Sequence, residues 1–93
     1  MTIKFIKTKA LPIFKRQGIT KAAVFGSYAR GDNKKSSDID FLIKAPPKMS
    51  LLGLSRLKID LEEGLGSEVD LVEYSTIHPL LKDRILKEQI AIL

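Results

Sequence analysis

The stretch Gly26–Asp40 reads GSYARGDNKKSSDID, and it decides how the chain is interpreted. Its first two residues, Gly26-Ser27, predict a turn, and ten residues later the Asp38-Ile39-Asp40 triplet follows. One further acidic residue, Asp70, stands inside a short apolar run. Three carboxylates beside a Gly-Ser turn are the set required for metal-assisted transfer of a nucleotide from a triphosphate.

Length and composition favour a small globular protein, with residues 1–93 expected to form a single domain. Cysteine is absent, so disulfides and thiolate metal sites are excluded and a cytoplasmic location is expected. We find no signal peptide and no apolar run near the roughly 18 residues that a membrane span needs. The net charge of +5 fits either a solvated helix face or attraction to a nucleotide, RNA or an acidic partner.

Hydrophobic spacing predicts an α/β (α+β) fold, a small sheet with helices packed on it. Pro12 interrupts the first helical pattern, which predicts a kinked helix or two short pieces ending at Gly18. The other expected elements are strands over 21–25, 38–43 and 68–73, a helical turn over 28–31, a helix from an N-cap at Ser50 to Gly64 and Gly66, a last helix from Pro79 to about Glu88, and a short edge strand over 90–93.

The acidic residues are expected on one face of the sheet. In a strand, residues two apart point the same way and lie about 6.6 Å apart, so Asp38 and Asp40 share a face. Two such carboxylates repel each other unless a divalent cation offsets the repulsion, and Mg²⁺ prefers hard oxygen ligands together with substrate phosphates. Asp70, on a predicted adjacent strand, can join them, and three carboxylates can hold two metals about 3.5–4 Å apart.

The turn supplies candidate phosphate donors. Gly26 lets the backbone approach a phosphate closely, the Ser27 hydroxyl adds a donor, and Arg30 contacts phosphates or fastens the loop. Each signal taken alone has an ordinary explanation: a Gly-Ser pair is usually only a turn, and Asp70 can be an exposed edge-strand charge. The three signals in this order indicate a site. The single histidine, His78, precedes Pro79 and is interpreted as a helix cap or an ordinary surface residue.

Taken together, these residues resemble the nucleotidyltransferase superfamily that includes DNA polymerase β, and most closely its minimal nucleotidyltransferases (MNT). The resemblance rests on Gly26-Ser27, the ten-residue spacing to Asp38-Ile39-Asp40, and Asp70 as the third acidic position. It implies a mixed sheet of the polymerase β-like fold, two Mg²⁺ ions and ATP as substrate. It also implies that Asp38, Asp40 and Asp70 are catalytic metal ligands, with Asp70 helping to activate the attacking hydroxyl, and that Ser27 holds the triphosphate.

The resemblance further implies a partner. The chain ends where larger superfamily members continue into an acceptor-binding domain, so acceptor recognition is expected from a second copy or from another protein. Minimal nucleotidyltransferases of this kind are paired with a HEPN ribonuclease toxin and act as its antitoxin by transferring AMP to a toxin tyrosine. The alternatives are transfer to a small hydroxylated molecule such as an aminoglycoside, and a non-catalytic antitoxin that occludes its toxin. Direct nucleic-acid binding is not expected, because no interleaved aromatic platform is present.

Overall fold

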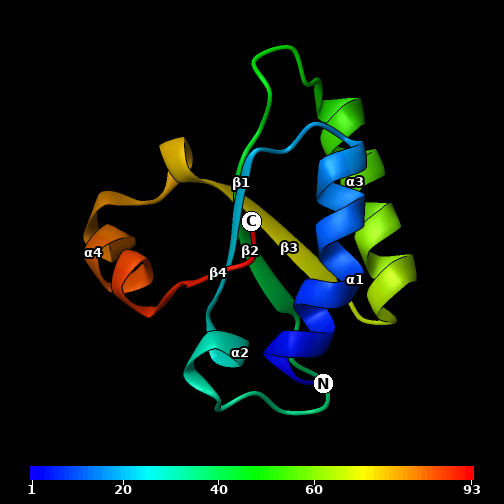
Figure 1. Ribbon diagram of the computed structural model, residues 1–93. Helices are drawn as coiled ribbons and strands as arrows, with labels where there is room; N and C mark the ends of the chain where they lie inside the picture. The colour runs from blue at the N-terminus through cyan, green and yellow to red at the C-terminus, as the bar shows by residue number, and fades with distance from the viewer.

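A computed structural model describes all residues, 1–93, as one mixed four-stranded sheet flanked by helices (Figure 1). The strand order is β3-β2-β1-β4, with β2 parallel to β3 and β1 antiparallel to both β2 and β4. The elements in chain order are α1 (Ile3–Arg16), β1 (Lys21–Phe25), α2 (Ser27–Arg30), β2 (Ile39–Lys44), α3 (Leu51–Leu65), β3 (Val69–Glu73), a 3₁₀ turn (Tyr74–Thr76), α4 (Pro79–Glu88) and β4 (Ile90–Ala91). The predicted sheet with packed helices is confirmed, and element ends differ from the predictions by one or two residues.

The first helix corrects one expectation. α1 is a single helix from Ile3 to Arg16 with Pro12 inside it, so the alternative of two short pieces is wrong. A proline within a helix removes one hydrogen bond and costs about 3 kcal/mol. The same helix buries a stripe of four side chains, Ile6, Ala10, Ile13 and Phe14. Burying one large apolar side chain contributes about 1.5–3 kcal/mol, so packing on the sheet outweighs the local penalty.

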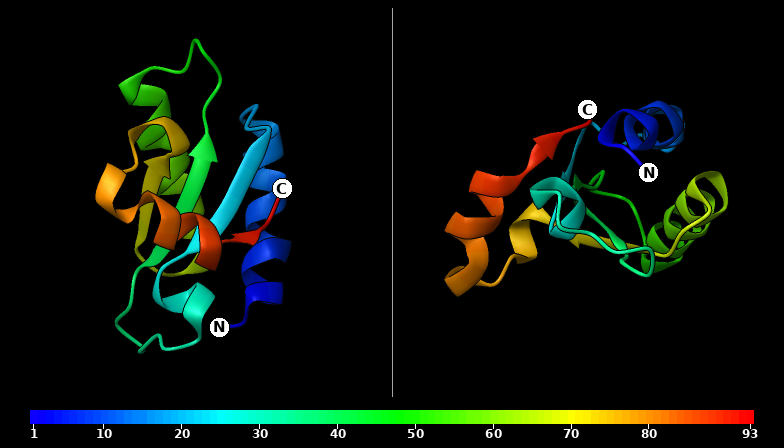
Figure 2. Two further views of the ribbon diagram at one scale, coloured as in Figure 1. Left: turned by 90° about the vertical axis from the view of Figure 1, so that its left-hand side faces the viewer. Right: turned by 90° about the horizontal axis from the view of Figure 1, so that it is seen from below.

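Helices cover the two faces of the sheet unequally. α1 and α3 lie side by side over one face, and α4 lies over the other (Figure 2). α3 begins at Ser50, whose side chain accepts a hydrogen bond from the Gly53 N–H, as the sequence predicts. α4 begins after His78, whose Nδ1 accepts a hydrogen bond from the Leu80 N–H at 3.1 Å, which confirms its capping role. No helix is long and apolar enough to cross a membrane.

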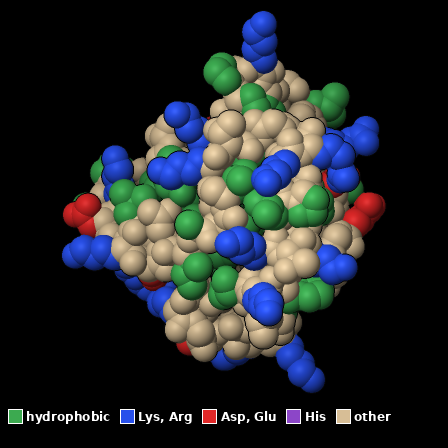
Figure 3. Space-filling model, viewed as in Figure 1, with side chains coloured by type: hydrophobic (Ala, Val, Ile, Leu, Met, Phe, Trp, Pro, Cys, Tyr) green, Lys and Arg blue, Asp and Glu red, His purple; other side chains and the backbone are tan.

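The surface seen from the same side as Figure 1 carries many more basic than acidic side chains (Figure 3). The Lys and Arg side chains are scattered over this face and do not gather in one patch. Dispersed charges of this kind are well solvated, so this face agrees with the interpretation of the positive excess as solvated surface charge.

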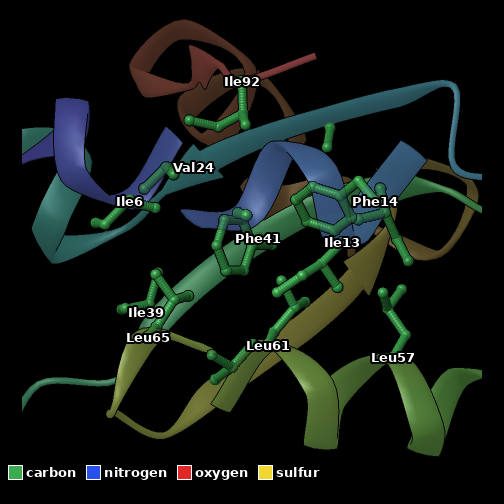
Figure 4. Close-up of a cluster of buried hydrophobic side chains, with 14 of the residues drawn as sticks. Ile6, Ile13, Phe14, Val24, Ile39, Phe41, Leu57, Leu61, Leu65 and Ile92 are labelled. Atoms are coloured by element: carbon green, nitrogen blue, oxygen red, sulfur yellow. The ribbon is translucent and has the colours of Figure 1, made fainter. Parts of the chain in front are cut away.

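The core lies between the sheet and the α1–α3 layer, and every buried side chain in the molecule is apolar or aromatic. At its centre the rings of Phe14 and Phe41 meet edge to face, with centroids 5.2 Å apart (Figure 4). Ile39, Phe41 and Ile43 all belong to this core, which confirms the predicted alternation along β2. Strand residues two apart share a face, so Asp40 and Leu42 are turned toward the α4 side.

Candidate functional site

Two of the three predicted carboxylates, Asp40 and Asp70, lie side by side near the end of the sheet where β2 begins. In the parallel pairing of β2 with β3, Asp40 and Asp70 are direct register partners. Neighbouring strands lie about 4.8 Å apart, so these two residues are side by side on one face. Asp38 lies just before β2 and borders a separate surface hollow lined by residues 35–38 and 66–68. As the side chains stand, no group of three or more Asp, Glu, His or Cys residues is arranged to hold a metal ion.

Electrostatics nevertheless link the three carboxylates. The pKa of Asp40 is raised from its ordinary value of 3.8 to about 6, first because burial disfavours its charged form and then because Asp70 and Asp38 repel it. Arg30 is the nearby cation that opposes this shift. Asp40 is half-buried, whereas Asp70 is exposed. The negative charge around Asp40 is therefore only partly compensated by the protein, and a bound cation would relieve it.

The Gly-Ser turn touches the carboxylate site directly. Phe25, the last residue of β1, pairs with Asp40, so Gly26 and Ser27 follow at the same end of the sheet. Gly26 has φ 75° and ψ −151°, a conformation that essentially only glycine adopts. A Cβ added to Gly26 would overlap the Asp40 carboxylate and would lie 3.2 Å from its Cγ. Glycine is therefore required twice, for the backbone angle and for the close approach of Asp40.

Arg30, at the end of α2, is held by two carboxylates. Its Nε donates to Asp32 Oδ2 at 3.1 Å, and its Nη1 donates to both Glu88 oxygens at 3.3 Å. These acidic partners, Asp32 first and Glu88 second, raise the pKa of Arg30. The same Glu88 Oε1 accepts the N–H of Gly26 at 3.0 Å. Arg30 therefore fastens the loop, one of the two roles considered for it, and it does so at the edge of the cavity.

A cavity of about 290 Å³ joins these parts. Its lining comes from the β1–α2 turn, from β2 and from one face of α4: Phe25, Gly26, Ser27, Arg30, Asp40, Leu81, Arg84, Ile85 and Glu88. The structure thus brings together four of the six residues predicted from sequence, whereas Asp38 and Asp70 line two other surface hollows. A cavity with a hydroxyl, two guanidinium groups and two carboxylates can accommodate an anionic ligand beside a cation.

The α4 residues of this cavity were missed by the sequence prediction. Leu81, Arg84, Ile85 and Glu88 recur at spacings of three and four, so they share one helix face. That spacing shows that the four residues share one face of α4, but it does not show which part of the protein this face contacts. A signal was present at Glu88, because an acidic residue in the last turn opposes the helix dipole and suggests a partner elsewhere.

Comparison with known proteins agrees with this geometry. Residues 7–92 match the nucleotidyltransferase domain family. MJ0435 of Methanocaldococcus jannaschii, named provisionally as a protein adenylyltransferase, is 53% identical over 93 residues and covers 100% of both chains. The protein adenylyltransferase MntA of Thermococcus cleftensis is 40% identical over 73 residues, 78% of this chain and 74% of that protein.

Solved structures show the same fold. One described provisionally as a minimal nucleotidyltransferase has a TM-score of 0.82 at 34% identity and covers 97% of this chain and 95% of its own, which confirms the predicted polymerase β-like fold. At 20% identity and a TM-score of 0.73, the fold recurs in a complex of tri-AMPylated Shewanella oneidensis HEPN toxin with MNT antitoxin, covering 97% of this chain and 71% of the matched one. The chain therefore belongs to the minimal nucleotidyltransferase family, and it is a nucleotidyltransferase.

Proposed function

We propose that this protein transfers AMP from ATP to a protein hydroxyl, a tyrosine of a HEPN-type ribonuclease, and thereby acts as an antitoxin. One observation carries the chemistry: Asp40 lies against the Gly26 turn and pairs with Asp70, at a cavity that also holds Ser27 and Arg30. The names of the archaeal relatives support protein as the acceptor. The HEPN partner is proposed from the complex that shares the fold.

The residues divide into a phosphate half and a carboxylate half. Ser27, the Gly26 turn and Arg30 are proposed to bind the triphosphate, because they supply a hydroxyl, a close backbone approach and a guanidinium at one cavity. The acceptor oxygen then bonds to the α-phosphorus, the bond to the bridging oxygen breaks, and pyrophosphate leaves. Asp70, which is exposed and pairs with Asp40, is proposed to help accept the proton of the attacking hydroxyl.

The carboxylate oxygens of Asp38, Asp40 and Asp70 suit Mg²⁺ chemically, although the three side chains as they stand are not arranged around one ion. All three offer hard carboxylate oxygens, and the raised pKa of Asp40 reflects burial and the repulsion of the other two. These residues are proposed to hold two ions, and bound Mg²⁺ would supply the positive charge that offsets both the carboxylates and the phosphates. The protein's own part is to keep Asp40 and Asp70 in register on parallel strands.

The test is incubation of the protein with a HEPN-type ribonuclease from the same organism, ATP and Mg²⁺. We expect the partner's mass to rise by one or more AMP units and its RNA cleavage to fall. Asp38→Ala and Asp70→Ala should block both effects. Asp60→Ala is a suitable control, because Asp60 on α3 instead contacts Gln17, far from this cavity.

Each outcome separates the proposal from its alternatives. If the carboxylate variants still suppress the ribonuclease and no mass is added, the protein works by occlusion. If AMP is added while RNA cleavage persists, the transfer stands and the antitoxin role is wrong. If AMP is instead transferred to a small hydroxylated molecule such as an aminoglycoside, the protein acceptor is wrong.

A further inference from the structure

Glu88 is the last residue of α4, and its side chain contacts the Gly26 turn and Arg30, which are proposed to bind the triphosphate. Its Oε1 accepts the Gly26 N–H at 3.0 Å, and both of its oxygens lie 3.3 Å from Arg30 Nη1. The side chain is only 14% exposed. The C-terminal end of α4 reaches the sheet end from which α2 starts, although 62 residues separate Glu88 from Gly26 (Figure 2). One carboxylate therefore joins a strained backbone turn, a cation and a distant helix.

The stability of α4 itself does not explain this placement. A carboxylate in the last turn of a helix faces the negative end of the helix dipole, which is unfavourable. A mostly buried carboxylate also needs partners to offset its lost hydration. Gly26 and Arg30 supply those partners. The contacts that compensate Glu88 thus lie in the turn and not in its own helix.

We propose that Glu88 is a positioning residue for nucleotidyl transfer, one that fixes the Gly26 turn and orients Arg30 toward the phosphates of the nucleotide. This inference rests on the proposed binding of ATP at the cavity. A guanidinium has five N–H donors in a rigid fork. Asp32 takes the Nε donor and Glu88 binds Nη1, which leaves Nη2 without a partner in the protein. Arg30 lines the cavity, so this group is available to a bound phosphate.

The contact between Glu88 and the Gly26 turn should also favour nucleotide binding. Gly26 has a positive φ, and its neighbour Ser27 carries the hydroxyl proposed to bind phosphate. When Glu88 anchors the Gly26 N–H, the turn keeps its conformation before the nucleotide arrives. Binding then loses less free energy to ordering of the site, which is the usual benefit of preorganisation.

The opposite role is that Glu88 competes with phosphate, since it occupies donors that a phosphate could use. The two roles predict effects of opposite sign. Removing a positioning residue weakens ATP binding, whereas removing a competing carboxylate strengthens it. Calorimetric titration with ATP and Mg²⁺ measures this sign directly and requires no acceptor.

The decisive variants are Glu88→Ala and Glu88→Gln. We expect Glu88→Ala to raise the Kd for ATP and the KM for ATP by about 10-fold, in the range of a lost charged hydrogen bond. The kcat should change less than the KM. Glu88→Gln keeps an oxygen acceptor for the Gly26 N–H and should lose less. Asp83→Ala is the matched control, because it removes the same charge from an exposed position of α4.

A double-mutant cycle with Arg30→Ala separates positioning from general structure. If Glu88 acts through Arg30, the Arg30→Ala change should weaken ATP binding less in the Glu88→Ala background than in the wild type. Thermal unfolding shows whether each variant is folded. Faster exchange of the Gly26 amide proton in Glu88→Ala should report the released turn without any nucleotide.

The outcomes that overturn the inference are distinct from those that overturn the proposed function. Wild-type affinity in Glu88→Ala, tighter binding in either variant, or strictly additive losses with Arg30→Ala would reject the positioning role alone. Failure of the wild-type protein to bind ATP with Mg²⁺ would reject the proposed function and this inference together. Binding without AMP transfer would reject only the proposed function.

Discussion

The two faces of the sheet at β2 differ in what they contact, although consecutive residues of one strand supply both. Phe41 points into the core and is fully buried among apolar side chains. Asp40 points the other way, is half-buried, and lies between Gly26 and the carboxylates. The first face stabilises the fold through burial. The second buries a smaller apolar cluster around Leu42 and, at Asp40, keeps negative charge that Arg30 compensates only in part, as is common at a ligand-binding site.

The largest expected effect is the loss of AMP transfer when the charge of Asp40 is removed. Asp40→Asn keeps the size of the side chain and removes its charge, so transfer of AMP should fall below detection while circular dichroism stays that of the wild type. In calorimetry, Mg²⁺ should no longer enhance ATP binding. Equal ATP affinity with and without Mg²⁺ in the wild type would contradict the metal site.

Truncating a core side chain on the opposite face of β2 should reduce the stability of the fold. Phe41→Ala removes a fully buried ring that packs on Phe14, and the expected loss is about 3–5 kcal/mol of unfolding free energy. Denaturant titration measures it. Leu80→Ala is the matched control, since Leu80 is 88% exposed and its truncation should change stability by less than about 0.5 kcal/mol. A small loss for Phe41→Ala would show that the core repacks.

Ser27→Ala separates the contribution of the Ser27 hydroxyl from that of the backbone of the turn. It removes one donor and leaves the backbone of the turn in place, so turnover should fall by about 10- to 100-fold, up to about 3 kcal/mol. Steady-state kinetics at saturating Mg²⁺ provide the measurement. Wild-type turnover would mean that the hydroxyl does not contact phosphate and that Gly26 alone matters, through the geometry of the turn.

The smallest effect is a pH dependence of stability. The pKa of Asp40 rises from 3.8 to about 6 on folding, so between these pH values the folded protein binds more protons than the unfolded chain. Stability of the metal-free protein should therefore fall as the pH rises from about 4 to about 6, and the loss should persist above pH 6. Asp40→Asn lacks this dependence. The melting temperature of Asp40→Asn should rise relative to that of the wild type as the pH is increased from 4 to 7. If the two melting temperatures change in parallel with pH, the pKa of Asp40 is not raised by folding.

Local patterns predicted much of the site. The alternation of Ile39 and Phe41 with Asp40 placed the carboxylate on the face away from the core, and Ser50 and His78 identified two helix starts. These features depend on residues close together in the chain, whose conformational preferences are expressed locally. The two-piece alternative for α1 was wrong because Pro12 sits in a helix whose buried stripe is stabilised by the sheet and by α3.

The sequence by itself determined the order of elements, the Gly-Ser turn and the position of Asp40 on the face of β2 opposite Ile39 and Phe41. Only the tertiary structure decided that Asp40 pairs with Asp70, that Gly26 touches the Asp40 carboxylate, and that Glu88 holds the turn. The physical reason is that these contacts join residues far apart in the sequence. Strand register and the docking of α4 follow from packing over the whole molecule, so no local pattern identifies Gly26 as the partner of Glu88, 62 residues away.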